Sequence, residues 1–485
     1  MLSLNSVITT RMGGASLWRI GVSKPSLTAV IMAAGKSTRM KSRLPKPLHP
    51  LCGKPLLSYL LDACKSAGVS RIIVVVGHEA ERVQEAFHGQ CEFALQEEQL
   101  GTGHAVMSAR QLLDGYEGDL LVLPGDTPLI DGDTLCKLVE HHRKSGALAT
   151  LLSAILPHDA GMYGRVLRDP GGKVLGVVEA KDATPEQLAV REINTSIYCF
   201  KSPALFDALQ EVRPNNAQGE YYLTDVIALL TQQGQSVEAV VADDWQVTLG
   251  VNTRVELADV ASRLRRRILE KLMLSGVTIV DPANTYIDAD VQIGQDTTVH
   301  PNTYILGNTA IGEECEIGPM ARIENSQIGN RTIVLASQVV ECRLGDGVRV
   351  GPFANLRPGT VVGNGTKIGD FVEVKNAVIE ENVSMAHLTY VGDAHVGANT
   401  NIGAGTITCN YDGKRKHRTI IGKGCFIGSH ATLIAPVEIG DGAYVAAASP
   451  INENVPPDSL AIARCRQVVK EEWAKRRREQ SSSEG

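Results

Sequence analysis

The second half of the chain repeats an aliphatic residue at every sixth position, often with a glycine directly after it. The first run is Ile293, Val299, Ile305, Ile311, Ile317 and Ile323. After a one-residue slip near Ile328, the second run is Leu344, Val350, Leu356, Val362, Ile368 and Val374. The phase returns at Val396 and Ile402, and again from Ile421 to Val445. This period fits neither a helix, with about 3.6 residues per turn, nor a simple alternating strand, and it predicts a parallel β-helix.

In a parallel β-helix each hexad supplies one short strand and a turn, and three hexads close one triangular coil. We expect the aliphatic residue to point into the coil and the following glycine to take backbone conformations that a Cβ would resist. The alternative is a β-sandwich with regular turns. Its strands would alternate with a period of two and its loops would vary in length. The six-residue phase is held too long to favour the sandwich.

The first half of the chain has a different hydrophobic pattern, in which strand-like and helix-like stretches alternate over residues 28–252. Residues 28–32, 71–77 and 119–124 are apolar runs without alternation, as in buried strands of parallel sheets, and residues 56–66 have helical periodicity. This alternation predicts a Rossmann-like α/β domain with a mixed, mostly parallel sheet. Its ligands are expected at the carboxyl ends of the strands.

The remaining segments divide the chain further. Residues 253–275 carry leucines and valines at helical spacing with arginines between them, which predicts a connecting helix before the β-helix of residues 276–472. Residues 473–485 are charged and serine-rich, and we expect a solvated tail. Residues 1–27 contain arginine and serine but no acidic residue. They have the composition of a transit peptide or of an over-extended start, and the second interpretation is favoured.

Composition restricts the classes of function. The formal net charge of −6 gives no reason to expect nucleic-acid or membrane-surface partners, and no apolar run has the ~20 residues of a membrane span. The ten cysteines contain no CxxC pair, so neither a zinc site nor a disulfide framework is indicated. A reduced, cytoplasmic location is expected.

Candidate chemistry begins after the first strand, where the sequence reads AAGKSTRM (33–40) and then LPKPLH (44–49). Small residues let backbone amides approach a triphosphate, and Lys36, Arg39 and Lys46 supply cations around it. The segment is neither a Walker A motif nor GxGxxG, so alone it is a weak signal. Further segments with candidate chemistry are EEQLGTGHA (97–105), PGDTPL (124–129), YGR (163–165), VEAKDAT (178–184), EINT (192–195), NNAQGEYYLTD (215–225) and GVNTR (250–254).

Together these motifs resemble the nucleotidyltransferases that join a nucleoside triphosphate to a sugar 1-phosphate. With the hexad repeats, residues 28–472 resemble the bacterial bifunctional N-acetylglucosamine-1-phosphate uridylyltransferase and glucosamine-1-phosphate acetyltransferase family, whose second domain is a left-handed parallel β-helix. Two positions depart from the family pattern: Ser37 replaces a usual glycine, and Pro124 stands where a tyrosine often precedes Gly-Asp. We expect altered side-chain packing at these two positions and intact chemistry.

The resemblance implies roles for residues of the first domain. Asp126 and Asn252 match ligands of Mg²⁺, and Lys46 and Arg39 match the cations that neutralise the departing pyrophosphate. Gly164, Glu179 and Asn194 match the residues that contact the acetamido sugar. The remaining positions that match contacts to UTP and UDP-N-acetylglucosamine are Met32, Ala33, Ala34, Gly35, Gln96, Gln99, Gly101, Thr102 and Gly125.

A polar cluster interrupts the hexads and suggests a second site. His387 is the candidate proton acceptor for the attacking amine of glucosamine 1-phosphate, because histidine is the usual general base in such reactions. Arg357, Lys375 and Lys416 fit a phosphate clamp, and Tyr390 and Asn401 fit sugar hydroxyls. Residues 408–416 (TCNYDGKRK) are too long and polar for a hexad and predict a projecting loop. By resemblance, the acetyl-CoA groove consists of Ala404, Asn410, Tyr411, Ser429, Ala447 and Arg464.

The expected enzyme therefore acetylates glucosamine 1-phosphate with acetyl-CoA and then transfers uridylyl from UTP, releasing pyrophosphate, with Mg²⁺ as cofactor of the second step. The resemblance also implies a homotrimer whose neighbouring prisms share the acetyl-transfer sites. A single-activity nucleotidyltransferase with a regulatory or oligomerising β-helix is the alternative, and His387 with its cationic neighbours argues against it. A non-enzymatic scaffold is a third possibility, and the presence of Lys46, Asp126 and Asn252 argues against that.

Overall fold

The computed structural model describes residues 26–483, so the expected leader lies almost wholly outside the described residues. The chain divides into two compact units. Unit 1 contains the chain up to His49 together with Leu56–Asn252, and unit 2 contains Pro50–Pro55 and the chain from Thr253 onward. Each unit is described by itself.

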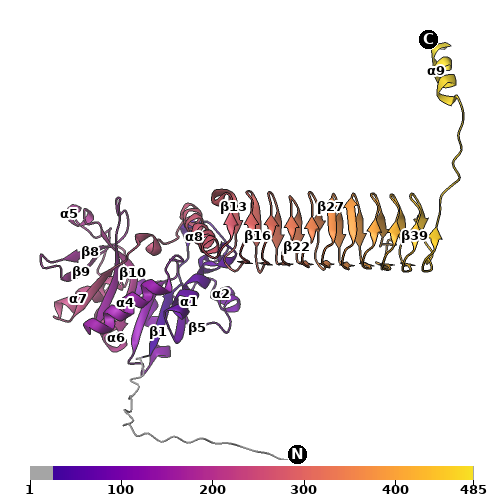
Figure 1. Ribbon diagram of the computed structural model, residues 1–485. Helices are drawn as coiled ribbons and strands as arrows, with labels where there is room; N and C mark the ends of the chain where they lie inside the picture. Colours follow the sequence, from indigo (N-terminus) through magenta and orange to yellow (C-terminus); the bar gives the residue numbers. More distant parts are fainter. Residues whose placement is uncertain (1–25, 484–485) are drawn as a thin grey trace, which may run out of the picture. The chain divides into compact units, whose positions relative to one another are not determined.

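Unit 1 is built on a nine-stranded sheet whose main path is β11-β7-β10-β6-β1-β4-β5 (Figure 1). The strands β6, β1, β4 and β5 are parallel neighbours, whereas β10 is antiparallel to β6 and β7. The sheet is therefore mixed and mostly parallel, as predicted. Its strands are β1 (Leu27–Met32), β4 (Arg71–Val76), β5 (Glu92–Leu95), β6 (Asp119–Pro124), β7 (Ala149–Ile155), β8 (Arg165–Arg168), β9 (Val174–Val178), β10 (Glu192–Lys201) and β11 (Val237–Val241).

Helices connect these strands, and all of them except the short α5 bury apolar residues. The helix α1 buries leucines at helical spacing, and α4 begins at an Asp131 side chain that accepts from the Thr134 amide. The helices of unit 1 are α1 (Leu56–Ser66), α2 (Ala80–Ala86), α3 (Thr102–Ser108), α4 (Gly132–Ser145), α5 (Pro185–Leu188), α6 (Ser202–Glu211) and α7 (Thr224–Gln232). Short 3₁₀ turns are η1 (Thr38–Met40), η2 (Lys46–Leu48), η3 (Arg110–Leu113) and η4 (Trp245–Thr248).

A buried charge network ties α4 to the amino end of β6. Asp119 is fully buried, and it accepts from Lys201 Nζ at 2.5 Å and Arg143 Nε at 2.6 Å. Burial raises the pKa of Asp119, but these two cations outweigh it and hold the pKa below its ordinary value. The neighbouring His142 is also fully buried, with Nδ1 2.9 Å from Thr150 Oγ1. Burial lowers the pKa of His142 to about 4.

We expect unit 1 to lose stability in acid because of His142. The unfolded chain binds a proton at this histidine near pH 6.5, whereas the folded chain binds it only near pH 4, so stability falls as the pH drops through that window. The shift corresponds to about 3 kcal/mol. Hydrogen exchange of the β6 and β7 amides in the full chain, measured from pH 7 to pH 4.5, should show a shallower loss of protection in His142→Gln. Equal slopes in the two proteins would contradict the assignment.

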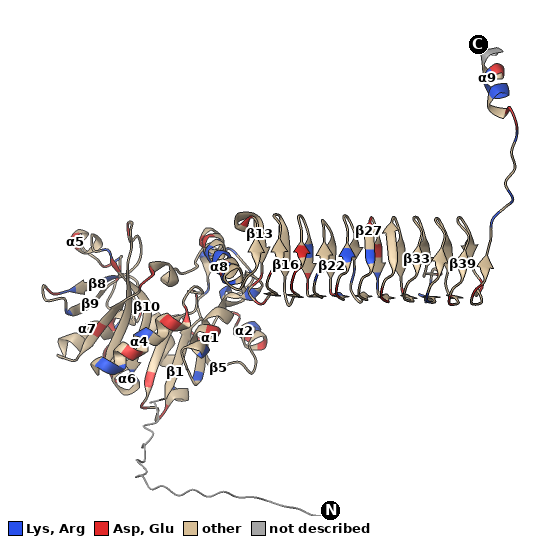
Figure 2. Cartoon of the chain, viewed as in Figure 1, with Lys and Arg blue, Asp and Glu red and all other residues tan. Residues whose placement is uncertain are grey.

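Unit 2 begins with α8 (Arg254–Leu274), the predicted connecting helix. A capping box of Thr253 and Glu256 starts it, and pairs four residues apart, such as Arg263 with Asp259 at 2.9 Å, line its surface (Figure 2). The hairpin β2 (Pro50–Leu51) and β3 (Lys54–Pro55) also belongs to this unit, although it lies far from α8 in the sequence. Lys54 pairs with Asp290 at 2.6 Å, and the Cys52 carbonyl accepts from the Ala289 amide.

The rest of unit 2 is the predicted parallel β-helix, in which three sheets run along a stack of coils (Figure 1). The eleven-stranded sheet is β12 (Thr278–Ile279), β15 (Thr298–Val299), β18 (Glu316–Ile317), β21 (Ile333–Val334), β24 (Arg349–Val350), β27 (Lys367–Asp370), β30 (Ser384–His387), β33 (Asn401–Ile402), β36 (Phe426–Ile427), β39 (Tyr444–Val445) and β41 (Leu460–Ala461). The ten-stranded sheet is β13 (Thr285–Ile287), β16 (Thr303–Leu306), β19 (Arg322–Glu324), β22 (Gln338–Val340), β25 (Asn355–Leu356), β28 (Glu373–Lys375), β31 (Tyr390–Gly392), β34 (Ile407–Cys409), β37 (Thr432–Ile434) and β40 (Pro450–Ile451). The nine-stranded sheet is β14 (Gln292–Ile293), β17 (Ala310–Ile311), β20 (Gln327–Ile328), β23 (Arg343–Leu344), β26 (Val361–Val362), β29 (Val378–Ile379), β32 (Ala394–Val396), β35 (Thr419–Ile421) and β38 (Val437–Ile439). A 3₁₀ turn, η5 (Pro282–Asn284), precedes β13.

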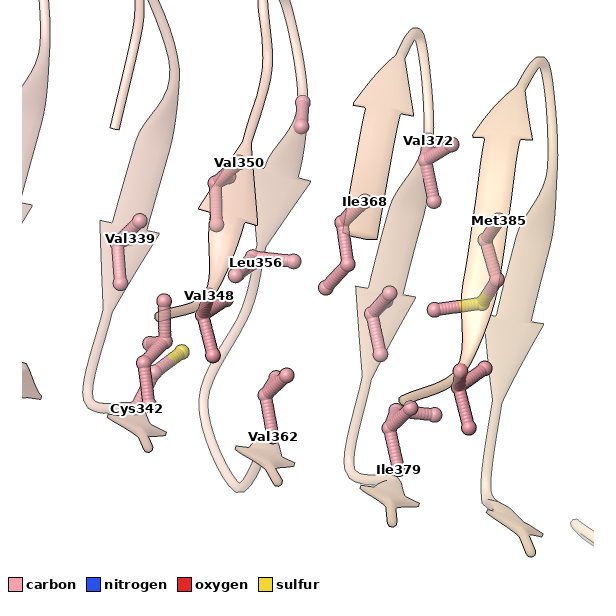
Figure 3. Close-up of a cluster of buried hydrophobic side chains, with 14 of the residues drawn as sticks. Val339, Cys342, Val348, Val350, Leu356, Val362, Ile368, Val372, Ile379 and Met385 are labelled. Atoms are coloured by element: carbon pink, nitrogen blue, oxygen red, sulfur yellow. The ribbon is translucent and has the colours of Figure 1, made fainter. Parts of the chain in front are cut away.

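The repeated aliphatic residues fill the interior of the prism, as predicted. Val350, Leu356 and Ile368 are almost completely buried, and Figure 3 shows such side chains pointing inward from successive strands. Ile293, near the α8 end, is only partly buried. The slip near Ile328 is a coil shortened by one residue, since Ile311 pairs with Ile328 across β17 and β20.

The glycine after the aliphatic residue has a different role from the expected one at several corners. A Cβ on Gly312 would lie 2.8 Å from the Asn330 backbone nitrogen, and one on Gly363 would lie 2.6 Å from the Glu380 carbonyl carbon. Neither glycine has a positive φ, so the constraint there is close contact with the next coil. Gly318 and Gly351 do have positive φ values of 92° and 100°. The conformational explanation is therefore correct for these two glycines and wrong for Gly312 and Gly363.

The end of the described chain is an exposed helix, α9 (Trp473–Ser483), where the sequence predicted only a solvated tail. Its positions carry no apolar face, which is why helical periodicity did not reveal it. Among residues 26–483, no helix is long and apolar enough to cross a membrane.

Candidate active sites

The first candidate site lies where β1, β4, β5 and β6 end, because parallel neighbours bring their carboxyl ends to one edge of the sheet. A cavity of about 460 Å³ opens there. The predicted residues that line it are Met32, Ala33, Ala34, Gly35, Arg39, Lys46, Gln96, Gln99, Gly101, Thr102, Gly125, Asp126 and Asn252. Lining residues that were not predicted to contact the nucleotide are Ser37, Thr38, Pro47, Ala105, Pro124, Ser196 and Glu220.

Small residues at this edge allow segments to approach closely. A Cβ on Gly125 would lie 2.7 Å from the Met32 carbonyl oxygen, and one on Gly77 would lie 2.8 Å from that of Ala34. Gly101 has a φ of 112°, and a Cβ there would lie 2.6 Å from the Tyr221 carbonyl oxygen. Larger residues at these positions would push the strand ends apart and change the cavity.

Two oxygens and two cations meet on one side of the cavity. Lys46 Nζ lies 2.5 Å from Asp126 Oδ2 and 3.0 Å from Asn252 Oδ1, and Arg39 Nη2 donates to the same Asn252 oxygen at 2.9 Å. The carboxylate and amide oxygens thus converge on a positive charge. Few oxygen ligands of this kind suit Mg²⁺, which completes its shell with water and phosphate, so the donor set fits the expected metal.

The expected sugar-side residues gather together away from the lining of this cavity. The Asn194 amide donates to the Gly164 carbonyl at 2.9 Å, and Glu179 Oε2 lies 3.4 Å from where a Cβ on Gly164 would be. Burial raises the pKa of Glu179, and a hydrogen bond from Thr224 offsets this rise only in part. Ser196 reaches the cavity instead, because the pairing of β10 with β7 shifts register between Asn194 and Ile197.

The second candidate site lies on the β-helix and contains a cluster of cations. The Lys416 ammonium, and after it the Arg357 guanidinium, hold the pKa of Lys375 below its ordinary value. These three groups come from β28, the turn after β25 and the loop after β34. Arg357 also pairs with Glu373 at 2.7 Å. Such a concentration of positive charge favours a phosphate dianion among the three side chains.

His387 stands at the end of β30 with its ring exposed. Its Nδ1 lies 2.6 Å from Asp370 Oδ1, and the two residues are register partners on adjacent coils. The carboxylate therefore holds the Nδ1 proton and leaves Nε2 as the basic nitrogen. The hydrogen bond to His387 lowers the pKa of Asp370.

The loop after β34 begins later than predicted and contributes to the second site. Thr408 and Cys409 belong to β34, because Thr408 points into the prism, so the loop starts at Asn410. The Asn410 amide donates to Asp393 Oδ2 at 2.5 Å and lies 3.5 Å from Tyr390 Oη. Tyr411 is an exposed loop residue paired with Lys416 through a β-bridge.

The other expected acetyl-CoA residues follow one corner of the prism. The Ala404 carbonyl accepts from the residue after Ser429, the Ser429 carbonyl accepts from the residue after Ala447, and Arg464 Nη1 donates to the Ala447 carbonyl. Ala404, Ser429, Ala447 and Arg464 are thus brought together on successive coils. Asn401 lies in β33, where its register partners are Ser384 and Phe426.

Comparison with known proteins agrees with both halves of the structure. Residues 29–169 match the MobA-like NTP transferase domain, and residues 290–325, 341–376 and 418–449 match the bacterial transferase hexapeptide repeats. The chain is 49% identical to the bifunctional protein GlmU of Geobacillus sp. (strain WCH70) over 92% of this chain and 97% of that protein. It is 52% identical to that of Pelotomaculum thermopropionicum over 93% of this chain and 99% of that protein.

The chain belongs to the GlmU family. The identity extends across both units, so the resemblance drawn from motifs in each half is confirmed for the chain as a whole. The α/β nucleotidyltransferase fold and the left-handed parallel β-helix of this GlmU family member are likewise confirmed.

Three acidic residues of the second site were missed from the sequence of this GlmU family member: Asp370, Glu373 and Asp393. A usable signal existed, because residues one coil apart become register neighbours. Asp370 is the partner of His387, and Glu373 is the partner of Tyr390. Inspection of the sequence positions one coil before His387 and Tyr390 would therefore have identified Asp370 and Glu373.

We expect Asp370→Asn to lower the kcat of acetyl transfer by at least about tenfold, because an amide can favour the wrong tautomer of its histidine partner. The KM for glucosamine 1-phosphate should change less, since Arg357, Lys375 and Lys416 are untouched. Steady-state kinetics with thiol detection of free CoA measures both constants. Unchanged kcat in a folded variant would show that Asp370 does not orient His387.

Proposed function

We propose that this protein makes UDP-N-acetylglucosamine in two steps, one in each unit. Unit 2 transfers an acetyl group from acetyl-CoA to the amine of glucosamine 1-phosphate. Unit 1 then transfers uridylyl from UTP to N-acetylglucosamine 1-phosphate and releases pyrophosphate. Membership of the GlmU family and the presence of both structural units support this pair of activities.

In unit 1 the sugar phosphate attacks the α-phosphorus of UTP, and the bond to the bridging oxygen of pyrophosphate breaks. No general base is required, because the attacking phosphate is already ionised. Lys46 contacts Asp126, and Arg39 contacts Asn252. These two cations supply positive charge to the triphosphate as negative charge moves onto the leaving group. Mg²⁺ held by Asp126 and Asn252 would supply further charge neutralisation there.

In unit 2 the amine of glucosamine 1-phosphate attacks the thioester carbonyl. The new C–N bond forms, the amine loses a proton to His387 Nε2, and the C–S bond breaks to release CoA, which takes up a proton. Asp370 keeps His387 in the required tautomer. Arg357, Lys375 and Lys416 hold the phosphate of the sugar, and this contact fixes the amine relative to His387.

The His387–Asp370 pair beside a cation cluster is the observation that best separates this function from a nucleotidyltransferase with a regulatory β-helix. Two half-reactions test it on one preparation. CoA release should require glucosamine 1-phosphate, and pyrophosphate release should require UTP and N-acetylglucosamine 1-phosphate. Pyrophosphate release without CoA release would favour the regulatory β-helix. We also propose a cytoplasmic location, because the ten free cysteines of the chain would stay reduced there.

We also propose a homotrimer formed through one corner of the β-helix. Met320, Ala336, Phe353, Phe371 and Leu388 follow one another at this corner, and we call them the corner ridge. All five have a positive φ, which is costly for non-glycine residues, and Phe353 and Phe371 are each 56% exposed. A row of exposed apolar side chains along successive coils is expected to be covered, and an identical row on a second copy has matching length and spacing.

The corner ridge also leads directly into the acetyl-transfer site. Leu388 follows His387, and the Leu388 carbonyl accepts from the amide of Gly405 on the next coil. On the following coils the position equivalent to His387 is taken by Ala404, Ser429 and Ala447, whose small side chains leave room for an extended pantetheine chain. A neighbouring copy on the ridge would therefore form one wall of this groove.

We expect light scattering to give a mass three times that of the 52.0 kDa chain. Phe353→Asp should lower this mass and reduce acetyl transfer by at least about tenfold, because a buried unpaired carboxylate disfavours association. Uridylyl transfer should stay within about twofold, since unit 1 carries its own cavity. Asp114→Asn, an exposed change in unit 1, serves as the control. A trimeric Phe353→Asp variant would remove the ridge from the interface.

A further inference from the structure

The carboxamide of Gln96 is held by two acceptors at the wall of the nucleotide cavity. Gln96 follows β5 and is 3% exposed, and its backbone amide donates to the Val76 carbonyl at 2.8 Å. Its side-chain nitrogen Nε2 lies 3.2 Å from the Gly101 carbonyl oxygen and 3.1 Å from His104 Nδ1. A carbonyl oxygen can only accept, so the NH₂ group of Gln96 must face Gly101.

This arrangement also determines the state of the histidine. Both hydrogens of the Gln96 NH₂ group are needed, one for Gly101 and one for His104, so His104 Nδ1 must be the accepting nitrogen and its proton resides on Nε2. The amide oxygen Oε1 is then the one polar atom of the Gln96 side chain left for a ligand. Within residues 26–483, no protein donor bonds to it.

We propose that His104 is a positioning residue for nucleobase selection. It keeps the Gln96 carboxamide turned so that an acceptor, Oε1, meets the base. Uracil carries an N–H at N3, which complements that acceptor, whereas N3 of cytosine carries a lone pair, which opposes it. This inference rests on the proposed uridylyl transfer and assigns its preference for a uracil base to the pair of Gln96 and His104.

The helix α3 places His104 for this role. Its first residues are held against the segment around Tyr221, where the Gly103 amide donates to the Tyr221 carbonyl at 2.7 Å. The ring of Tyr221 lies 6.4 Å from that of His104. Because Gly101 and His104 belong to one short segment, both acceptors for Gln96 move together, and the amide orientation is set before the nucleotide binds.

Two isosteric substitutions test the inference. His104→Leu places a methyl group where Nδ1 was, and His104→Asn can place an accepting oxygen there. We expect the leucine variant to raise the KM for UTP and to reduce the ratio of kcat/KM for UTP over CTP, each by about tenfold or more, because a buried hydrogen-bonding group is left without its partner. The kcat with UTP should change much less, since the base lies away from the reacting phosphorus. The asparagine variant should retain the wild-type ratio.

A circular-dichroism spectrum and thermal melt that match the wild type serve as the control for folding of unit 1, which contains His104. His104→Ala is a second variant without an acceptor should the leucine variant misfold. Leucine or alanine variants that keep the wild-type ratio of UTP to CTP would overturn the positioning role alone. A wild-type protein that transfers neither nucleotide to N-acetylglucosamine 1-phosphate would contradict the proposed function and this inference with it.

Discussion

Replacing Asp126 with alanine is expected to lower uridylyl transfer by about 10³-fold or more, because the site loses the carboxylate that fits Mg²⁺ and the partner of Lys46. Lys46 Nζ would then keep its contact with the Asn252 oxygen at 3.0 Å but lose the carboxylate. Acetyl transfer should remain near the wild-type rate, since Asp126 belongs to unit 1 and His387 to unit 2. Pyrophosphate release and CoA release, measured on one preparation, give both rates.

The matched control is Asp114→Ala, which removes an exposed carboxylate of unit 1 outside the cavity lining. It should leave both rates unchanged. A parallel loss of both activities in Asp126→Ala would mean that Asp126 supports the fold of the whole chain. Full uridylyl transfer in the folded variant would remove Asp126 from the first site.

His387→Ala is expected to lower the kcat of acetyl transfer by about 10² to 10⁴-fold, the range for loss of a positioned proton acceptor. The KM for glucosamine 1-phosphate should change less, because Arg357, Lys375 and Lys416 still hold the phosphate. Uridylyl transfer and the oligomeric mass should not change, since the His387 side chain is 59% exposed and outside the prism core.

A second histidine on the β-helix provides the control for this substitution. His300 also lies beside a carboxylate, with Nε2 3.3 Å from Glu316 Oε1, but it is far along the chain from the cation cluster. His300→Ala should keep full acetyl transfer. Near-full acetyl transfer by a trimeric His387→Ala variant at neutral pH would show that another base or water takes the proton.

Much of the architecture could be predicted because it depends on local repetition. The hexads repeat one strand and turn, so their phase predicts both the coils and the side chains inside them. Apolar strands followed by glycine similarly predict a ligand site at the carboxyl ends of a mostly parallel sheet. Residues 33–35 and Asp126 line the cavity at this edge.

Features that depend on contacts between residues far apart in the chain were harder to predict from the sequence. The hairpin Pro50–Pro55 joins unit 2 through Asp288 to Asp290, which no local pattern reveals. Ser196 reaches the cavity through a register shift in β10, and alternation along that strand would not predict it. Asp370 becomes a partner of His387 only once the length of each coil is known.

The most direct test of the account is a single reaction of the purified full chain with glucosamine 1-phosphate, acetyl-CoA, UTP and Mg²⁺, analysed by mass spectrometry. The account predicts UDP-N-acetylglucosamine, CoA and pyrophosphate in equal amounts. Omitting acetyl-CoA should abolish the acetylated product, and omitting UTP should leave N-acetylglucosamine 1-phosphate. Release of pyrophosphate with added N-acetylglucosamine 1-phosphate, but no acetylation of glucosamine 1-phosphate under any condition, would contradict it.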